Sequence, residues 1–399
     1  MANAWRSLPC KISELRLDIT LDCGQSFRWK EIQPGVWRSV LANKVWTLKQ
    51  NDHQILYQIH SDDSPPSRDT AVKQEDGVND EKQPHKAKQN VSAGKKSKTK
   101  QVVNSAKQED SGLSVEKKED EKSREMVYSA ILKDYFQLHV SLEKLYKTFK
   151  AADANFAKVC PGFPGVRVLR QDPTENLFSF ICSTNNNISR ITGMVETLCS
   201  SYGEKLAVID GTSWYAFPSV GALAQDGIEQ ELRDRGFGYR AKFINQTAQF
   251  IEKQPEGWLE GLRGLEYEEA HTELVRLPGV GAKVADCVCL MSMDKADAIP
   301  VDTHVWQIAS RDYMPSLSKT KSLTDRVYKE IGAFFRSLFG EYAGWAHSVL
   351  FSADLKKFQT KLGAEKSLAK KRTSKKKDAG DAKRVRQERN GGKTTKQNR

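Results

Sequence analysis

The pattern of hydrophobic and polar positions changes period along this 399-residue chain. Between residues 26 and 59, short runs rich in aromatic and β-branched residues alternate with polar turns such as Gln33-Pro34-Gly35, which is typical of antiparallel strands. The expected strands are SFRW (26–29), VWRSVLA (36–42), VWTLK (45–49) and ILYQI (55–59). From Val127 onward, apolar residues recur at helical spacing instead.

The second part of the chain is predicted to form a series of helices with short polar connections. They cover residues 127–136, 141–150, 174–182, 187–201, 228–235, 240–253, 268–276, 282–293, 303–311, 322–338 and 343–353. No repeat at solenoid periods is present in the sequence. The expected fold class is therefore α+β, a mainly α-helical body with an N-terminal antiparallel β-sheet domain.

Two segments are too polar to fold by burying apolar side chains. Residues 61–125 contain 14 basic and 14 acidic residues but no Phe, Tyr, Trp, Ile or Met, so we expect a disordered charged insertion. Residues 356–399 are expected to form a disordered basic tail. The ordered parts are then 1–60, the first part of the N-terminal β domain, and 126–355, the helical body whose early part completes that domain.

The net charge of +12 comes from the tail, in which 17 Lys and Arg outnumber 4 Asp and Glu, while the rest of the chain is close to neutral. A basic composition therefore does not identify the partner of the folded part. The basic runs at 370–377 and 383–386 suit a two-part nuclear import signal, so we expect a nuclear protein and leave a minor mitochondrial pool open. A tail that only aids solubility is the alternative.

The cysteines and histidines show no metal-site spacing. The seven cysteines form no CxxC pair and the seven histidines no HxxxH pair, so no metal or other cofactor is expected. No secretory leader precedes the cysteines, and no apolar run approaches the roughly 20 residues of a membrane span. We expect a soluble intracellular protein without membrane contacts.

The sequence LPGVGAKVADC, residues 277–287, places a lysine at the head of a helix that is apolar almost all round. The turn before it is bracketed by Gly279 and Gly281. A helix pair joined by such a turn exposes backbone N–H groups and the positive end of the second helix dipole, which suits a DNA phosphate. An ordinary structural corner is the alternative.

Lys283 lies in the first turn of that second helix, and Cys287 and Met291 follow on the same face. If this face lines a substrate pocket, a partly desolvated amine near a positive helix end is favoured as a neutral nucleophile. A lysine that extends its ammonium group to solvent would have no such role.

A candidate carboxylate follows in IPVDTHVWQIA, residues 299–309. Asp302 occupies the position of a helix N-cap, and an ionised capping carboxylate can also stabilise the cation that develops when a glycosidic bond breaks. His304 is either a phosphate ligand or a surface histidine.

Together, LPGVGAKVADCVCL and IPVDTH resemble the helix-hairpin-helix, Gly/Pro-rich, Asp superfamily of base-excision DNA glycosylases. Within it, CGQSFRW, RQDPTENLFSFICSTNNNISRITGMVE, GFGYRA and YAGWAHSVLFSADL resemble the eukaryotic 8-oxoguanine DNA glycosylase and AP lyase. The resemblance runs from about Trp5 to Leu355, apart from the charged insertion. It implies an enzyme that flips 8-oxoguanine paired with cytosine out of double-stranded DNA, excises it and initiates base excision repair. Formamidopyrimidine-guanine is expected as a second substrate.

The resemblance also implies roles for individual residues. Lys283 would attack the sugar C1′, form a Schiff base and permit β-elimination, and Asp302 would assist it and stabilise the oxocarbenium-like transition state. Cys287 and Phe351 would sandwich the flipped purine. The carbonyl of Gly24 would accept the N7–H that 8-oxoguanine has and guanine lacks.

On the DNA side, the same resemblance places Asn185 in the vacated base stack, Arg190 and Arg240 on the orphaned cytosine, and Tyr239 as a wedge beside it. Three successive asparagines are poor helix formers, which favours a DNA-facing loop at 185–187. Arginine suits cytosine because it donates to the acceptors left bare when guanine leaves.

One position departs from the family pattern. His347 stands where the family has a glutamine that reads the Watson-Crick edge of the flipped guanine. Neutral imidazole has its donor and acceptor on opposite sides of the ring and cannot make the paired contact of an amide. We expect looser purine recognition, shifted in part toward formamidopyrimidines.

Other functions would require different residues in the sequence. Relatives of the endonuclease III type carry four cysteines after the aspartate, whereas none follows Cys289 here, which excludes an iron-sulfur cluster on ligand count. A DNA-binding module without catalysis needs neither Lys283 nor Asp302, and glycosylases for alkylated bases lack the lysine. We expect a monomer, with downstream base excision repair proteins as further partners.

Overall fold

The computed structural model describes residues 4–60, 109–320 and 322–360, without the side chains of 109–121. These residues belong to two units, of which the first comprises the chain up to Ser61 and from Ser129 onward. The second unit, Asp62–Tyr128, is described only as the first part of one helix. Most of the predicted insertion and most of the predicted tail lie outside the described residues, so the domain boundaries stay a prediction.

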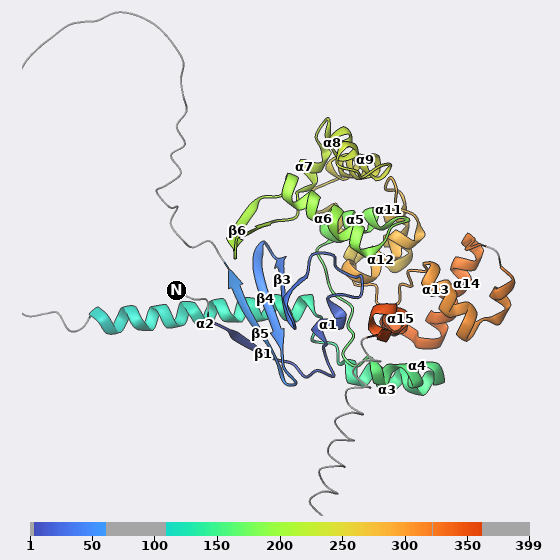
Figure 1. Cartoon of the computed structure of the whole chain (residues 1–399), viewed down its shortest axis with the longest axis horizontal. Helices are drawn as coiled ribbons and strands as arrows, with labels where there is room; N and C mark the ends of the chain where they lie inside the picture. The colour runs from blue at the N-terminus through green and yellow to red at the C-terminus, as the bar shows by residue number, and fades with distance from the viewer. Residues whose placement is uncertain (1–3, 61–108, 321, 361–399) are drawn as a thin grey trace, which may run out of the picture. The chain divides into compact units, whose positions relative to one another are not determined.

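An antiparallel sheet of five strands forms the N-terminal part, in the order β1-β5-β4-β3-β2 (blue in Figure 1). The strands are β1 Arg6–Pro9, β2 Lys30–Gln33, β3 Val36–Leu41, β4 Lys44–Gln50 and β5 Gln54–His60. The predicted meander is confirmed for its last three strands. The first was wrong: residues 26–29 are all buried, and Arg28 pairs with Glu175 at 2.9 Å, so this segment enters the interior and β2 starts after it.

The rest of the chain is mainly helical, which confirms the predicted fold class. The helices are α1 Leu17–Thr20, α2 Glu109–Tyr135, α3 Leu142–Ala152, α4 Ala154–Val159, α5 Pro173–Ser183, α6 Ile188–Tyr202, α7 Val220–Ala224, α8 Ile228–Asp234, α9 Arg240–Glu252, α10 Trp258–Gly261, α11 Tyr267–Val275, α12 Ala282–Ser292, α13 Thr303–Ile308, α14 Asp325–Phe339 and α15 Ala343–Asp354. Every predicted helix has a counterpart among them.

Further features differ from the sequence prediction. Helix α2 begins at Glu109 rather than near 127, because the Lys and Glu residues that made this stretch too polar for a core are also strong helix formers. The packed body extends to Phe358, since this side chain is only 3% exposed and Lys357 pairs with Asp22 at 2.8 Å. A hairpin of β6 (Lys205–Ile209) and β7 (Thr212–Tyr215) was not foreseen in its short, mixed sequence.

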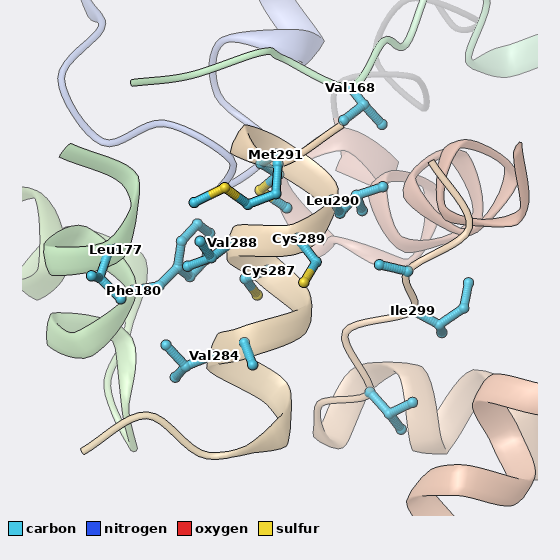
Figure 2. Close-up of a cluster of buried hydrophobic side chains, with 14 of the residues drawn as sticks. Val168, Leu177, Phe180, Val284, Cys287, Val288, Cys289, Leu290, Met291 and Ile299 are labelled. Atoms are coloured by element: carbon cyan, nitrogen blue, oxygen red, sulfur yellow. The ribbon is translucent and has the colours of Figure 1, made fainter. Parts of the chain in front are cut away.

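Helix α12 lies at the centre of the hydrophobic core. Every residue from Val284 to Ser292 is buried, and Figure 2 shows Leu177 and Phe180 of α5 on one side of the helix and Ile299 on the other. This enclosure explains why the helix is apolar almost all round. Among the described helices, none has the length and apolar character needed to cross a membrane.

Candidate active site

A cavity along α12 collects residues that are far apart in the sequence. Its lining includes all the side chains and the glycine predicted for catalysis and substrate binding: Gly24, Lys283, Cys287, Met291, Asp302, His347 and Phe351. Residues not foreseen from the sequence complete it: Cys23, Gln25, Phe180, Pro300, Ser348 and Ser352. The cavity has a volume of about 60 Å³, well below the roughly 300 Å³ of small-ligand pockets. The walls must therefore separate before a purine can enter.

Lys283 reaches this cavity from the N-terminal end of α12, where Gly281 is the N-cap. Its Nζ lies 4.9 Å from the ring centroid of Phe180 and 3.4 Å from Ser183 Oγ. The Ser183 hydroxyl donates its own proton to the carbonyl of Phe180 at 2.7 Å, which leaves its lone pairs facing the amine. The amine is thus held by an aromatic face and a hydroxyl acceptor, both from α5.

Asp302 is the N-cap of α13, as the sequence predicts. Its Oδ1 accepts a hydrogen bond from the backbone N–H of Val305 at 2.9 Å. The cap fixes the carboxylate at a helix N-terminus, where the dipole favours negative charge. A half-buried anion on the cavity wall can stabilise a cation that forms inside.

The remaining side chains of α12 give the cavity an apolar wall. Cys287 is 2% and Met291 9% exposed. Burial raises the pKa of the Cys287 thiol to about 11, although the neighbouring Lys283 opposes the rise. The thiol is therefore neutral near pH 7 and offers a polarisable surface rather than a charge.

His347 adds a polar group to the cavity lining. It is 6% exposed, and burial lowers its pKa to about 4, although the Asp302 carboxylate acts in the other direction. Neither ring nitrogen has a hydrogen-bond partner within the described part of the chain. Buried polar atoms are nearly always paired, so a neutral imidazole with an open donor and an open acceptor suits a bound substrate.

Gly24 lies in a conformation that favours glycine. Its φ of +86° is in the left-handed region, and an added Cβ would lie 3.3 Å from Ile188 Cδ1. The neighbouring Gln25 holds this segment in place: its amide donates to the carbonyl of Arg167 at 2.7 Å and accepts from the N–H of Leu169 at 3.0 Å. Gln25 carries no sequence signal for this role, because its partners are more than 140 residues away.

The predicted DNA-contacting residues gather around the loop between α5 and α6. Asn185 is exposed at a φ of +46°, which asparagine tolerates. The Tyr239 hydroxyl donates to the carbonyl of Thr184 at 3.0 Å, and Tyr239 is 46% exposed. Arg190 is exposed and donates to the carbonyl of Gly236 at 3.3 Å.

Arg240 differs from its neighbours in being buried, at 3% exposure. Its Nη2 donates to the carbonyls of Thr184 and Asn185, and its guanidinium lies 4.6 Å from the ring centroid of Tyr239. In this conformation Arg240 therefore shapes the Asn185 loop.

The predicted hairpin joins α11 to α12. Gly279 has a φ of +78°, and a Cβ there would lie 2.4 Å from the ring of Phe243, so this position requires glycine, whereas the space around Gly281 is open. His304 lies outside the cavity lining but beside it, with its ring edge-on to Phe351 at 5.9 Å and Nδ1 3.9 Å from Asp354 Oδ2.

Two sequence families match adjoining parts of the chain. The profile of the 8-oxoguanine DNA glycosylase N-terminal domain matches residues 7–177, and that of the HhH-GPD superfamily base excision DNA repair proteins matches residues 178–333. The N-glycosylase/DNA lyase OGG1 of Arabidopsis thaliana is 35% identical over 363 residues, covering 90% of this chain and 82% of the relative. The N-glycosylase/DNA lyase of Saccharomyces cerevisiae is 41% identical over 249 residues, 56% of this chain and 66% of its own.

Solved structures share the fold. The apo 8-oxoguanine glycosylase/lyase of Clostridium acetobutylicum matches with a TM-score of 0.61 and 26% identity, covering 85% of this chain and 93% of that chain. The same bacterial enzyme in complex with double-stranded DNA containing cytosine opposite 8-oxoG matches with a TM-score of 0.62 and 25% identity, covering 88% and 98%.

Proposed function

This chain belongs to the N-glycosylase/DNA lyase family of the HhH-GPD superfamily, and we propose that it excises 8-oxoguanine opposite cytosine from duplex DNA and then cleaves the strand. One observation carries this proposal: Lys283 and Asp302 line the same cavity as Gly24, Cys287 and Phe351. A nucleophile, an anion and surfaces for a flipped base thus meet in one pocket.

The lysine supplies the covalent chemistry. The neutral amine of Lys283 attacks C1′ of the flipped nucleotide, and the bond from C1′ to the base breaks, with the electron pair leaving on the base, which takes up a proton. Opening of the sugar gives a Schiff base between Nζ and C1′. Loss of a proton from C2′ then expels the 3′ phosphate, and water releases the lysine. Phe180 and Ser183 hold the amine in the pocket without fixing it in an ion pair.

Asp302 acts on the charge that develops during base release. As the bond to the base lengthens, positive charge spreads over C1′ and the ring oxygen, and an ionised carboxylate nearby lowers the energy of that state. The capping hydrogen bond from Val305 holds this carboxylate in place before substrate binds. Little reorganisation is then needed in the transition state.

The base is held by an apolar sandwich and a few polar contacts. Cys287 on α12 and Phe351 on α15 face the cavity and provide the two surfaces. Because the thiol is neutral, it stacks on the purine without adding charge. The backbone of Gly24 can approach the base closely, since no side chain intervenes.

His347 is the residue that we propose alters base preference. Its two ring nitrogens offer one donor and one acceptor on opposite sides of the ring, so only one of them can face a given base edge. A guanine edge that presents a donor beside an acceptor is therefore read less completely than by an amide. We propose that formamidopyrimidine-guanine, whose opened ring is more adaptable, is a better substrate relative to 8-oxoguanine here than in relatives with glutamine.

The loop at Asn185 and the neighbouring Tyr239 form the proposed contact with the opposite strand. Both are exposed. The Tyr239 hydroxyl donates to the carbonyl of Thr184, and Arg240 donates to the carbonyl of Asn185. Arg190, which is exposed, would donate to the orphaned cytosine. Arg240 would do the same after leaving the carbonyls of Thr184 and Asn185. The hairpin at Gly279 and Gly281 would meet the phosphate backbone.

We propose that the protein acts in the nucleus, and the basic tail supports this proposal. The runs at 370–377 and 383–386 suit import into the nucleus and nonspecific phosphate contacts. We propose a monomer that hands its cleaved product to later enzymes of base excision repair. Fusion of residues 356–399 to a fluorescent reporter tests the import signal, and a cytoplasmic reporter would contradict it.

The test of the proposed substrate is base release from defined duplexes. The full-length protein is incubated in excess with 8-oxoguanine opposite each of the four bases, and with formamidopyrimidine-guanine opposite cytosine, and the freed base is measured by mass spectrometry. Cytosine is expected to give the fastest release of 8-oxoguanine. Binding to all duplexes with no base released would mean a DNA-binding module and would contradict the proposal.

The variant His347→Gln isolates the proposed preference in the same assay. Restoring the amide should raise the rate on 8-oxoguanine relative to formamidopyrimidine-guanine by about three- to ten-fold, since one good base-edge contact discriminates by about 1 kcal/mol or more. An unchanged ratio would mean that His347 does not set the preference.

A further inference from the structure

A second carboxylate lies buried on α12, on the side facing α11 and α14. Asp286 follows Lys283 by three residues and is 1% exposed. Tyr267 of α11 donates its hydroxyl proton to Asp286 Oδ1 at 2.6 Å, and Tyr328 of α14 donates to Oδ2. Asp286 does not line the base cavity, so the chemistry proposed above does not use it.

The Tyr328 hydroxyl also contacts the backbone that leads to Asp302. The N–H of Val301, the residue before Asp302, donates to Tyr328 Oη at 3.4 Å, and the carbonyl of Ile299 lies 3.4 Å from the same atom. A hydroxyl has one proton, and the shorter contact is with Asp286, so the proton is directed to the carboxylate. The result is one path of hydrogen bonds from the Val301 N–H through Tyr328 to Asp286.

The surroundings favour a tightly held geometry. Burial raises the pKa of Asp286, and hydrogen bonds from the two tyrosines oppose that rise. Burial also raises the pKa of both tyrosines, so they remain protonated donors. His271 Nε2 lies 3.9 Å from Asp286 Oδ1, and the guanidinium of Arg336 lies 5.4 Å from the ring centroid of Tyr267. Hydrogen bonds to a buried carboxylate are directional and strong.

We propose that Tyr328 is a positioning residue that, through Asp286, fixes the segment carrying Asp302 relative to the helix carrying Lys283. Asp286 is rigidly part of α12, one turn from the amine, and Val301 is bonded directly to Asp302. The tyrosine thus joins the two halves of the reaction centre from outside the pocket. This inference rests on the proposed glycosylase and lyase activity.

The chain offers a matched control for this role. Tyr328→Phe and Tyr267→Phe each remove one hydroxyl donor from the same carboxylate, and both side chains line an open cavity of about 580 Å³ that water can enter. Of these two tyrosines, only Tyr328 is also hydrogen-bonded to the backbone of residues 299–301. The two variants should therefore lose similar stability but differ in catalysis.

The experiment compares thermal unfolding, DNA affinity and single-turnover base release for the full-length protein and both variants. Tyr328→Phe is expected to slow base release by about ten-fold or more with DNA affinity unchanged, because small misplacements of reacting groups cost large factors in rate. Tyr267→Phe should slow it less than about two-fold. Hydrogen exchange at residue 301 should rise in Tyr328→Phe alone.

Equal rates in the two variants, or a Tyr328→Phe rate equal to wild type, would overturn the positioning role. If the wild-type protein itself released no base, the proposed function would fail instead, so the two failures are distinguishable. Should Tyr328→Phe not fold, Asp286→Asn takes its place. It keeps both hydroxyls but weakens the acceptor, and it should slow base release by at least about three-fold; a wild-type rate would overturn the proposal.

Discussion

His347 and Phe351 lie one turn apart on α15, with ring centroids 6.2 Å apart and ring planes inclined by 31°. His347, which we propose reads the base edge, therefore lies next to Phe351, which we propose stacks on the base. The same enclosure removes water from the imidazole, which is why its pKa falls so far below the ordinary value.

The stability of the protein should depend on pH through His347. In the unfolded chain this histidine titrates near 6.5, but its pKa in the folded protein is about 4. As pH falls below 6.5 the unfolded chain takes up the proton first, so the free energy of unfolding decreases until about pH 4. The loss from this group is roughly 3 kcal/mol between pH 7 and 4, and there is none above pH 7.

Urea unfolding of wild type and His347→Gln at pH 7, 5.5 and 4 measures this contribution. Carboxylates titrate in both proteins, so only the difference between them reports on the histidine. The difference should shrink or reverse in favour of the variant as the pH falls. A difference that is constant with pH would show that His347 binds its proton equally well in both states.

Gly24→Ala should impair the pocket beyond its effect on stability. An alanine at a φ of +86° costs about 1 kcal/mol, and its Cβ would press on Ile188 and displace the carbonyl that we propose accepts a hydrogen bond from the base. We expect release of 8-oxoguanine to slow by about ten-fold or more.

Gly35→Ala is the control for that substitution. Gly35 lies between β2 and β3 at a φ of +74°, and a Cβ there would meet no atom within 4 Å. It should lower the melting temperature by a similar amount and leave base release intact. Equal loss of activity in both variants would mean that backbone strain alone explains the effect.

Ser183→Ala tests the hydroxyl that faces Lys283. Loss of the acceptor 3.4 Å from Nζ should slow Schiff-base formation by about two- to five-fold, the size of one modest hydrogen bond, with DNA affinity unchanged. Rapid-quench kinetics of borohydride trapping measure the step. Ser352→Ala is the comparison, because Ser352 also lines the cavity but donates to the carbonyl of Ser348; equal slowing in both would contradict a specific role for Ser183.

Periodicity predicted the helices well because each helix presents its own apolar face, and a local pattern records that face. The cap at Asp302 was predicted for the same reason, since its partner is Val305, three residues away. Segments whose environment is set by distant residues were not. SFRW looks like a strand, but Arg28 is drawn into the interior by Glu175 and by the carbonyl of Tyr215.

The candidate site shows the same division. Spacing alone placed Lys283, Cys287 and Met291 on one helical face, but no local rule brings Gly24 to them; only the family resemblance did. Ser183 and the Asp286–Tyr328 contact had no signal, because serine and tyrosine are common and the contacts span 100 and 42 positions. The buried state of Arg240 was also missed, since it depends on carbonyls of the loop before α6.

The most direct test of a Schiff base at Lys283 is borohydride trapping of the 399-residue protein on a labelled duplex that carries 8-oxoguanine opposite cytosine. Wild type should yield a covalent protein-DNA band, and Lys283→Gln should yield none while binding the duplex with similar affinity. Release of free base by wild type without any trapped band would contradict the claim that Lys283 forms a Schiff base, and would leave Asp302 acting with water alone.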